Sequence, residues 1–512
     1  MAGFGKNFAF LKQERAERIE NKVQGNLVLR VLTSHTALAF CYGIFLFAFD
    51  MAFLRDTVSF IHPVLIGWAG ALAVYDVVVR RLWQKLPFWQ PLAVFALLAG
   101  VTALVNRQAG LVGNIKAWVM TVLPLVAFWP LCLLQKKEKR EKALLTALSG
   151  AAVLVFLASL VAVVLYLLRI SVEVELWGIT RLVGFRHHIP DDPESAVLLY
   201  GLYFDTNHAA AYAIVFAAYS LWLLNACRRG LIAGWKKLAV RIFAAANLVV
   251  QLCYFPLANS RGGWLSLSVT LIISAFLYLF CTRLKSWKFL GRLALSAGAA
   301  VLIMAILCYG LVLLRSGLSS LSYVLEYVPE SASSGPASDG PVTLQPVKPP
   351  TYTRPEHDSF VKTDQNLGSG RTIIWAEAMD VYAIYPVLGI GPDNSTHYAR
   401  LHGIGQKLPA GASLHNSFLD VLIDYGALGF LALMSFYFGC VWLVLRKFFK
   451  FGDQATEATH ISAFCVVFLA GVSLLLSCLF VSTTAMYFIL LCPMSFLVAQ
   501  CSGKVQKAHA EE

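Results

Sequence analysis

Long apolar segments, separated by short polar ones, follow one another through most of the chain. A helix needs about 20 predominantly apolar residues to cross the hydrocarbon core of a bilayer. The pattern therefore predicts twelve membrane-spanning helices, at 32–54, 60–79, 88–106, 112–134, 143–168, 206–225, 238–257, 263–281, 290–315, 416–445, 460–481 and 484–500. The first segment is too long for a cleaved signal peptide. We expect an all-α integral membrane protein with about 12 transmembrane helices.

The basic residues gather in alternate polar segments. Six lie before position 31, and the others form clusters at 80–85, 136–142, 228–241, 283–292, 446–450 and 504–507. Short cytoplasmic loops of membrane proteins are enriched in Lys and Arg. The pattern predicts that these clusters and both termini are cytoplasmic.

This orientation divides the chain into alternating membrane and aqueous parts. The predicted parts are a cytoplasmic segment 1–31, helices 1–5 in 32–168, an external loop 169–205, helices 6–9 in 206–315, a large external loop 316–414 between helices 9 and 10, helices 10–12 in 416–500, and a cytoplasmic tail 501–512. The large loop contains a Ser/Pro/Gly-rich stretch at 329–356, which we expect to be disordered. Apolar residues at helical spacing then predict an amphipathic helix over 371–385 on the external membrane surface.

The composition agrees with a membrane protein. Of the 512 residues, 58% are hydrophobic and 14% are charged, whereas soluble domains carry about 25% charged residues. This excludes an ordinary soluble enzyme, a disordered protein and a nucleic-acid-binding protein. The net charge of +13 is explained by topology, so we expect a lipid membrane and no nucleic acid as partner.

No cofactor site is indicated by the sequence. The 11 cysteines lie in apolar segments or at their cytoplasmic ends, without a CxxC pair, and are interpreted as packing residues. The spacing of the histidines does not support a metal site, and no phosphate-binding loop of the GxxxxGK type is present. We expect neither metal nor cofactor.

The segment His415–Gly429, HNSFLDVLIDYGALG, is the most informative. His415 and Asn416 lie where a predicted helix begins at the external face. The amides and dipole of a helix N-terminus attract anions and favour a neutral imidazole. The alternative is that His415 only caps the helix. We expect Gly426 and Gly429 to allow close helix packing.

Three further segments carry polar residues at the external face: Ser260–Trp264 (SRGGW), Arg371–Trp375 (RTIIW) and Gly201–Ala213 (GLYFDTNHAAAYA). Their candidate residues are Arg261, Arg371 and Asn207, together with Arg181 or Arg186 in the preceding loop. Alternatively, Arg261 reaches the lipid headgroups, Arg371 is an interfacial anchor, and the Asn207 segment only caps a helix through Asp205 or Thr206.

Carboxylates within the predicted spans form another group of candidates. Asp420 and Asp424 are one turn apart in the tenth span, and intramembrane carboxylates are functional candidates because their burial is costly. They could instead bond to polar groups in the core of the bundle. Asp76 lies four residues before Arg80, which predicts a local ion pair.

These motifs, in this order, resemble the O-antigen ligases and the related Wzy-type polysaccharide polymerases over Arg181–Gly429. The His415 segment fits the family pattern of His, Asn, nine residues, Gly, two residues and Gly. The resemblance implies a GT-C-type fold of twelve spans. It also implies a glycan donor carried on undecaprenyl pyrophosphate, an acceptor hydroxyl on a glycan or lipid-linked acceptor, and no metal.

For this reaction the resemblance implies that His415 is the general base that deprotonates the acceptor hydroxyl. Arg261 would neutralise the leaving pyrophosphate, helped by Arg371 and by Arg181 or Arg186. Asn207, Asn416 and Asp420 would contact the substrate. A single displacement would invert the anomeric centre.

The implied location is the bacterial cytoplasmic (inner) membrane, with the site on its external face and a polysaccharide-synthesis complex as a possible partner. We prefer a polymerase slightly over a ligase that acts on lipid A–core or a protein, because no specialised acceptor domain is visible. A flippase for the same lipid-linked glycan is the alternative of another class. The polar residues cluster at one face, whereas a flippase needs them along a path through both leaflets.

Overall fold

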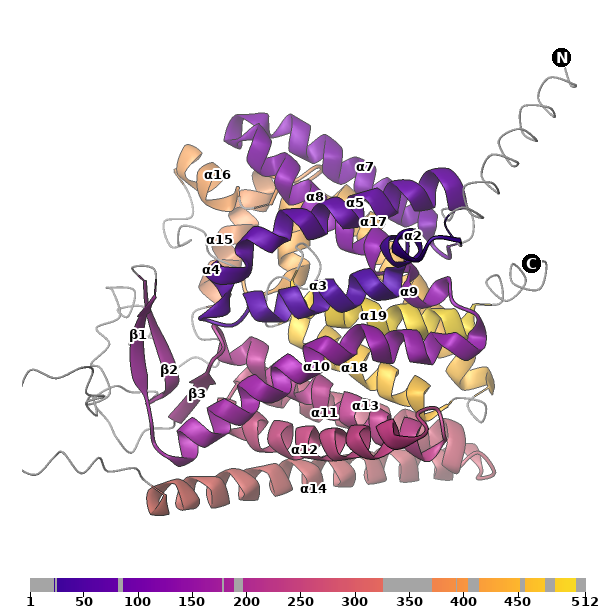
Figure 1. Ribbon diagram of the computed structural model, residues 1–512. Coiled ribbons are helices and arrows are strands. Elements are labelled where there is room, and N and C mark those ends of the chain that lie inside the picture. The colour runs from indigo at the N-terminus through magenta and orange to yellow at the C-terminus, as the bar shows by residue number, and fades with distance from the viewer. Residues whose placement is uncertain are drawn as a thin grey trace, which may run out of the picture.

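The structure is a computed structural model (Figure 1). It describes residues 23, 25–81, 86–176, 179–187, 197–325, 371–392, 394–403, 414–451, 456–474 and 484–502. The expected disordered stretch at 329–356, most of the segment 1–31 and nearly all of the tail 501–512 lie outside the described residues.

A helix occupies each of the twelve predicted positions. The main helices are α3 (His35–Phe49), α5 (His62–Tyr75), α7 (Trp89–Val105), α8 (Leu111–Ala127), α10 (Lys137–Leu167), α11 (Thr206–Arg228), α12 (Trp235–Ala258), α13 (Arg261–Tyr278), α14 (Phe289–Val324), α17 (Ser417–Phe451), α18 (Glu457–Ser473) and α19 (Ala485–Cys501). Shorter helices are α2 (Leu27–Leu32), α4 (Leu54–Val58), α9 (Pro130–Leu133), α15 (Arg371–Ile384) and α16 (Ser395–Leu401).

By length and composition, eight helical stretches among the described residues could cross a membrane. Four more apolar helices, α3, α7, α18 and α19, have 15 to 17 residues. The prediction of a mainly helical membrane protein is confirmed, whereas the count of twelve spans and the GT-C type stay predictions.

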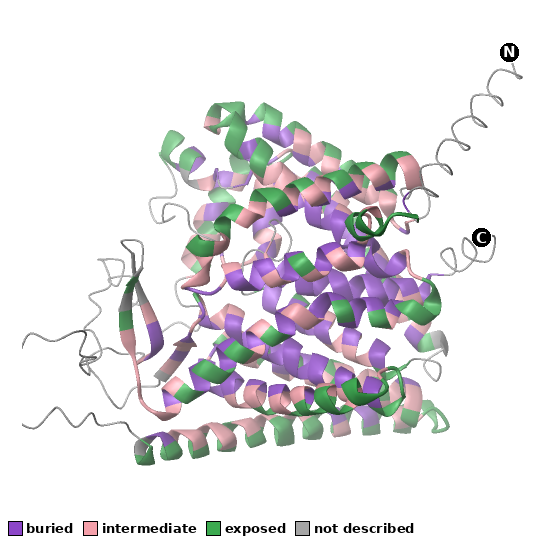
Figure 2. Ribbon diagram, in the orientation of Figure 1, coloured by how far each residue is buried: buried purple, intermediate pink, exposed green. Residues whose placement is uncertain are grey.

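Burial varies strongly from helix to helix, as Figure 2 shows. Of the 18 most apolar consecutive residues of α11, 89% are buried, whereas in α14 the share is 6%. Helix α11 is therefore central in the bundle, and α14 lies at its edge, where apolar side chains remain exposed. An edge helix of this composition is suited to contact lipid.

The predicted loop 169–205 contains a small sheet that the sequence analysis missed. Strands β1 (Val172–Leu176), β2 (Ile179–His187) and β3 (Val197–Gly201) are antiparallel in the order β1-β2-β3. The alternation Val-Glu-Val-Glu-Leu in β1 is the period-two pattern of a strand. An entirely helical description is wrong for this segment, and Figure 1 shows the sheet at the same end of the bundle as α15 and α16.

The predicted ion pair of Asp76 is confirmed. Its carboxylate lies 3.0 Å from the guanidinium of Arg80 and 2.7 Å from Nε2 of His35. Asp76 follows the end of α5 and His35 begins α3, so their contact joins these two helices. A buried carboxylate requires such partners.

Helix α17 is interrupted at Gly426, whose φ of 64° and ψ of −175° are not helical. Residues 386–390, which follow α15, supply hydrogen-bond partners for the backbone groups that the interruption leaves free. The amide of Ala427 donates to the carbonyl of Pro386 (2.8 Å), and the amide of Ile390 donates to the carbonyl of Ile423 (3.0 Å). Gly426 thus breaks the helix, and the close packing expected of it is with the backbone of Val387 and Gly389 rather than with another helix.

Buried polar side chains from α7 and α8 hold this segment in place. The hydroxyl of Thr102 donates to the carbonyl of Leu388 (2.7 Å), and Nδ2 of Asn394 donates to Oδ1 of Asn114 (2.8 Å). These bonds satisfy backbone and side-chain groups that water cannot reach. Residues 386–392 and Asn394 are therefore fixed between α7, α8 and the interruption in α17.

We expect Gly426→Ala to destabilise the protein. A Cβ at this position would lie 2.3 Å from the carbonyl oxygen of Val387, and the left-handed backbone costs a non-glycine residue about 1–3 kcal/mol. The measurement is the apparent unfolding temperature of the detergent-purified protein. Gly310→Ala is the matched control, because an added Cβ there meets nothing within 4 Å. If both variants melted like the wild type, the interruption at Gly426 would be incorrect.

Candidate active site at the sheet end of the bundle

Three of the motifs begin helices, and a side chain caps each beginning. Oδ1 of Asp205 accepts from the amide of Asn207 at the start of α11 (2.6 Å). Oγ of Ser260 accepts from the amide of Gly263 in α13 (3.1 Å). Each cap satisfies amides of the first turn that have no partner inside the helix.

Asn416 supplies the cap of α17. Its Oδ1 accepts from the amides of Phe418 (3.0 Å) and Leu419 (3.1 Å). His415 lies just outside the helix with a φ of +51°, a value that is uncommon for a residue other than glycine and often marks a functional constraint. Asn416 thus supplies a side-chain cap of α17, and a chemical role for His415 stays a prediction.

A hydrogen bond joins the beginnings of α11 and α13. The hydroxyl of Ser260 donates to Oδ1 of Asn207 (2.7 Å) while it accepts from the amide of Gly263. Asn207, a predicted substrate contact, thus also fixes the residue before Arg261. Two motifs that are 53 residues apart meet at one point.

Asp50, at the end of α3, is a further member of this group that the sequence analysis missed. Its Oδ2 accepts from the hydroxyl of Tyr212 (2.6 Å) and lies 3.4 Å from Nδ1 of His208. In the sequence, Asp50 is a carboxylate at the end of an apolar segment, which is a signal for a functional candidate. Nothing in the sequence indicates that its partners are Tyr212 and His208, 162 and 158 residues later. Asp50 thus connects α3 to the capped start of α11.

Helix α15 brings Arg371 toward His415. Nε1 of Trp375 donates to the carbonyl of Leu414 (2.8 Å), and residues four apart share one face of a helix. The buried residues of α15, Ala378 and Val381, form a small core with residues of α16 and α17. The apolar face predicted for the membrane surface thus packs against protein.

The electrostatics of His415 favour the neutral imidazole. Burial lowers the pKa of His415 from its ordinary value, the positive charge of Arg371 lowers it further, and the carboxylate of Asp205 opposes both. Burial also lowers the pKa of Arg371, which Asp205 raises. These three groups are therefore within electrostatic reach of one another, and the imidazole can accept a proton at neutral pH.

The structure places the other predicted residues less closely. Arg261 is exposed at the first position of α13, and Asp420 is 9% exposed in the first turn of α17. The guanidinium of Arg186 in β2 lies 5.1 Å from the ring centre of Tyr200. Arg181 pairs with Val174 in the sheet, and its side chain is outside the described part. Arg371 and His415 are within electrostatic reach of each other, and Asn207 is joined to the residue before Arg261, whereas Arg186 packs on Tyr200.

Within the described residues, no group of three or more His, Cys, Asp and Glu side chains could hold a metal ion. The groups described at this end of the bundle include the imidazole of His415, the carboxylate of Asp205 and the guanidinium of Arg371. Such a set can bind an anion and move a proton.

Residues 246–434 match the model of a family described as O-antigen ligase. This match confirms the resemblance that the motifs indicate. The matched segment contains Arg261, Arg371, His415, Asn416 and Asp420, whereas Asn207 and the sheet precede it. A search of curated proteins found no match.

We expect Ser260→Ala to lower the apparent unfolding temperature, because it removes a helix cap, worth about 1 kcal/mol, and the bond to Asn207. Ser435→Ala is the matched control. Its hydroxyl bonds only to the carbonyl one turn back in α17 and is exposed. Equal melting of the two variants would show that Ser260 does not join α11 to α13.

Proposed function

From the O-antigen ligase domain at residues 246–434, we propose that this membrane enzyme transfers a glycan from undecaprenyl pyrophosphate to an acceptor hydroxyl. The observation that carries the proposal is the half-buried His415, whose pKa is lowered by burial and by Arg371. A neutral base beside a fixed positive charge suits a reaction with a hydroxyl nucleophile and an anionic leaving group.

The proposed reaction is a single displacement. The acceptor oxygen attacks the anomeric carbon, its proton passes to the imidazole of His415, and the bond from the anomeric carbon to the phosphate oxygen breaks. The configuration at the anomeric carbon inverts, and undecaprenyl pyrophosphate leaves with the bonding electron pair. The imidazolium then releases its proton to water.

Arginine residues bind the leaving group in this proposal. A guanidinium can donate two parallel hydrogen bonds to phosphate oxygens, so Arg371 and the exposed Arg261 can neutralise the pyrophosphate as it forms. Arg371 has a second effect, since its charge also keeps His415 neutral before the reaction. Asp205 acts in the opposite direction and stabilises the imidazolium after it has formed.

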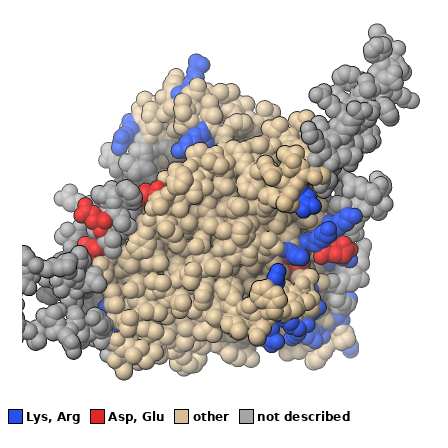
Figure 3. All heavy atoms as spheres, viewed as in Figure 1, with Lys and Arg blue, Asp and Glu red and all other residues tan. Residues whose placement is uncertain are grey.

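The proposed orientation places this site on the external face of the bacterial cytoplasmic membrane, with both termini in the cytoplasm. Supporting it, helix α11 begins beside the site and ends at the basic pair Arg228 and Arg229, as the enrichment of Lys and Arg on the cytoplasmic side requires. Figure 3 shows a broad surface without charged side chains, flanked by a group of Lys and Arg at the end away from the sheet.

Polymerase is the slightly preferred activity, and ligase is the alternative. Joining two lipid-linked repeats needs an acceptor of the same chemical class as the donor and therefore no specialised acceptor domain. A ligase would instead receive lipid A–core or a protein. A polysaccharide-synthesis complex is a proposed partner in either case.

We expect His415→Ala to reduce glycan transfer by about 10²–10⁴-fold, the usual contribution of a general base. The assay uses the protein in lipid vesicles with one undecaprenyl-pyrophosphate-linked repeat, and it measures glycan length. His397→Ala, on the exposed face of α16, is the control and should retain full activity. Wild-type turnover by the His415 variant would exclude its role as base.

The same assay separates the proposed activities. A ladder of longer lipid-linked glycans identifies a polymerase. An unchanged repeat that is consumed only when lipid A–core or a protein acceptor is added identifies a ligase. Failure with every acceptor would overturn the proposed transfer and favour the flippase.

We expect the activity to fall on the acid side at a pH below the ordinary histidine value of about 6.5, because the lowered pKa keeps His415 deprotonated there. Arg371→Gln removes a charge that lowers this pKa, so its acid limb should move to higher pH. Asp205→Asn keeps a capping side chain but removes a charge that raises the pKa, so its limb should move to lower pH. The measurement is kcat/KM against pH, and shifts in the same direction would contradict the assignment.

A further inference from the structure

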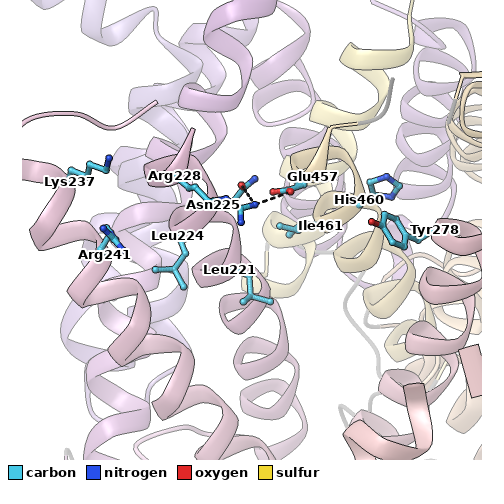
Figure 4. Close-up of a pocket in the computed structure, with 10 residues that line it drawn as sticks. All are labelled: Leu221, Leu224, Asn225, Arg228, Lys237, Arg241, Tyr278, Glu457, His460 and Ile461. Atoms are coloured by element: carbon cyan, nitrogen blue, oxygen red, sulfur yellow. Dashed lines mark hydrogen bonds and ion pairs between the residues drawn. The ribbon is translucent and has the colours of Figure 1, made fainter. Parts of the chain in front are cut away.

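A cavity lies at the other end of α11, away from the candidate active site. Helix α11 has 23 residues, which at about 1.5 Å per residue span roughly 35 Å. The cavity has a volume of about 680 Å³. Its walls come from α11, α12, α13 and α18 (Figure 4), and the lining residues are Leu221, Leu224, Asn225, Arg228, Lys237, Arg241, Tyr278, Glu457, His460 and Ile461.

Positive charge exceeds negative charge around the cavity. Arg228 bonds to the carboxylate of Glu457 and to Oδ1 of Asn225, at 3.2 and 3.3 Å. Lys237 and Arg241, one turn apart on α12, form no ion pair with any carboxylate that the structure describes. Two cations thus remain available to an anion in the cavity.

A buried donor in the wall also calls for an acceptor. Asn225 is 8% exposed, and its Nδ2 has no hydrogen-bond partner among the described residues. The bond from Arg228 to Oδ1 fixes the orientation of the amide, so Nδ2 is the donor that has no partner among the described residues. Buried donors without partners are rare in proteins, and an anionic oxygen in the cavity would satisfy this one.

The remaining walls are apolar. Leu221, Leu224 and Ile461 line the cavity beside the cations, and the side chain of Leu221 is 49% exposed. The site therefore has cationic side chains at one end and an apolar wall beside them. These two parts suit the anionic phosphate headgroup and the apolar acyl chain of a phospholipid. The basic end of the bundle is the cytoplasmic end by the distribution of Lys and Arg.

We propose that this cavity binds the phosphate headgroup of an anionic phospholipid from the cytoplasmic leaflet, with one acyl chain along Leu221. Lys237, Arg241 and Nδ2 of Asn225 contact the phosphate. Basic pockets between transmembrane helices are suited to such headgroups. The proposal does not depend on the glycan transfer, since it concerns the opposite end of the helix bundle.

The test titrates the full-length protein, in an uncharged detergent, with phosphatidylglycerol that carries a fluorescent acyl chain. We expect Lys237→Gln/Arg241→Gln to weaken binding about 30-fold, since each basic residue near a lipid surface contributes about fivefold. Asn225→Leu should weaken binding about tenfold, because it removes a donor to a charged group.

Lys139→Gln/Lys142→Gln is the matched control. It removes two exposed basic residues from the same end of the bundle, on α10, outside the cavity wall. Unchanged binding in this variant supports the cavity as the site, and equal weakening in both double variants would overturn it. Equal binding of phosphatidylcholine, or displacement of the lipid by millimolar inorganic phosphate, would overturn an anionic lipid as the occupant.

Discussion

Inside a bilayer, every backbone amide needs a partner within the protein, and this constraint organises the candidate active site. Helices α11, α13 and α17 all begin at one end of the bundle, and Asp205, Ser260 and Asn416 cap them. Because each cap lies within two residues of a residue of the proposed chemistry, satisfying the amides also places Asn207, Arg261 and His415. The side chains that stabilise the helix ends therefore also fix the positions of the candidate residues beside them.

The interruption of α17 depends on the same constraint. Gly426 leaves the helical conformation within an apolar segment, and the freed backbone groups bond to the segment after α15. Thr102 and Asn114, from α7 and α8, complete this arrangement. The interrupted region connects the N-terminal third of the chain to the helix that begins next to His415, so distant core substitutions can affect the position of the proposed base.

Charge distinguishes the two ends of the bundle. At the sheet end, His415, Arg371 and Asp205 act on one another electrostatically, and the balance of these charges sets the proton affinity of the imidazole. At the other end, Lys237 and Arg241 line a cavity together with Glu457, the one carboxylate among its described lining residues. Helix α11 reaches from one end to the other and is the most buried of the long spans.

The apolar segments were sufficient to locate the helices, because the roughly 20 apolar residues that cross the hydrocarbon core give a strong local signal in the sequence. The small sheet and the interruption at Gly426 were missed, since the former is short and the latter depends on a distant segment that supplies hydrogen-bond partners. His415, Arg261 and Arg371 could be selected as candidates from local motifs. Their surroundings could not, because only long-range packing brings Asp205 near Arg371 and His415 and joins Ser260 to Asn207. Residue type and spacing thus determine which groups can react, whereas tertiary contacts determine which charges surround them and hence their proton affinity.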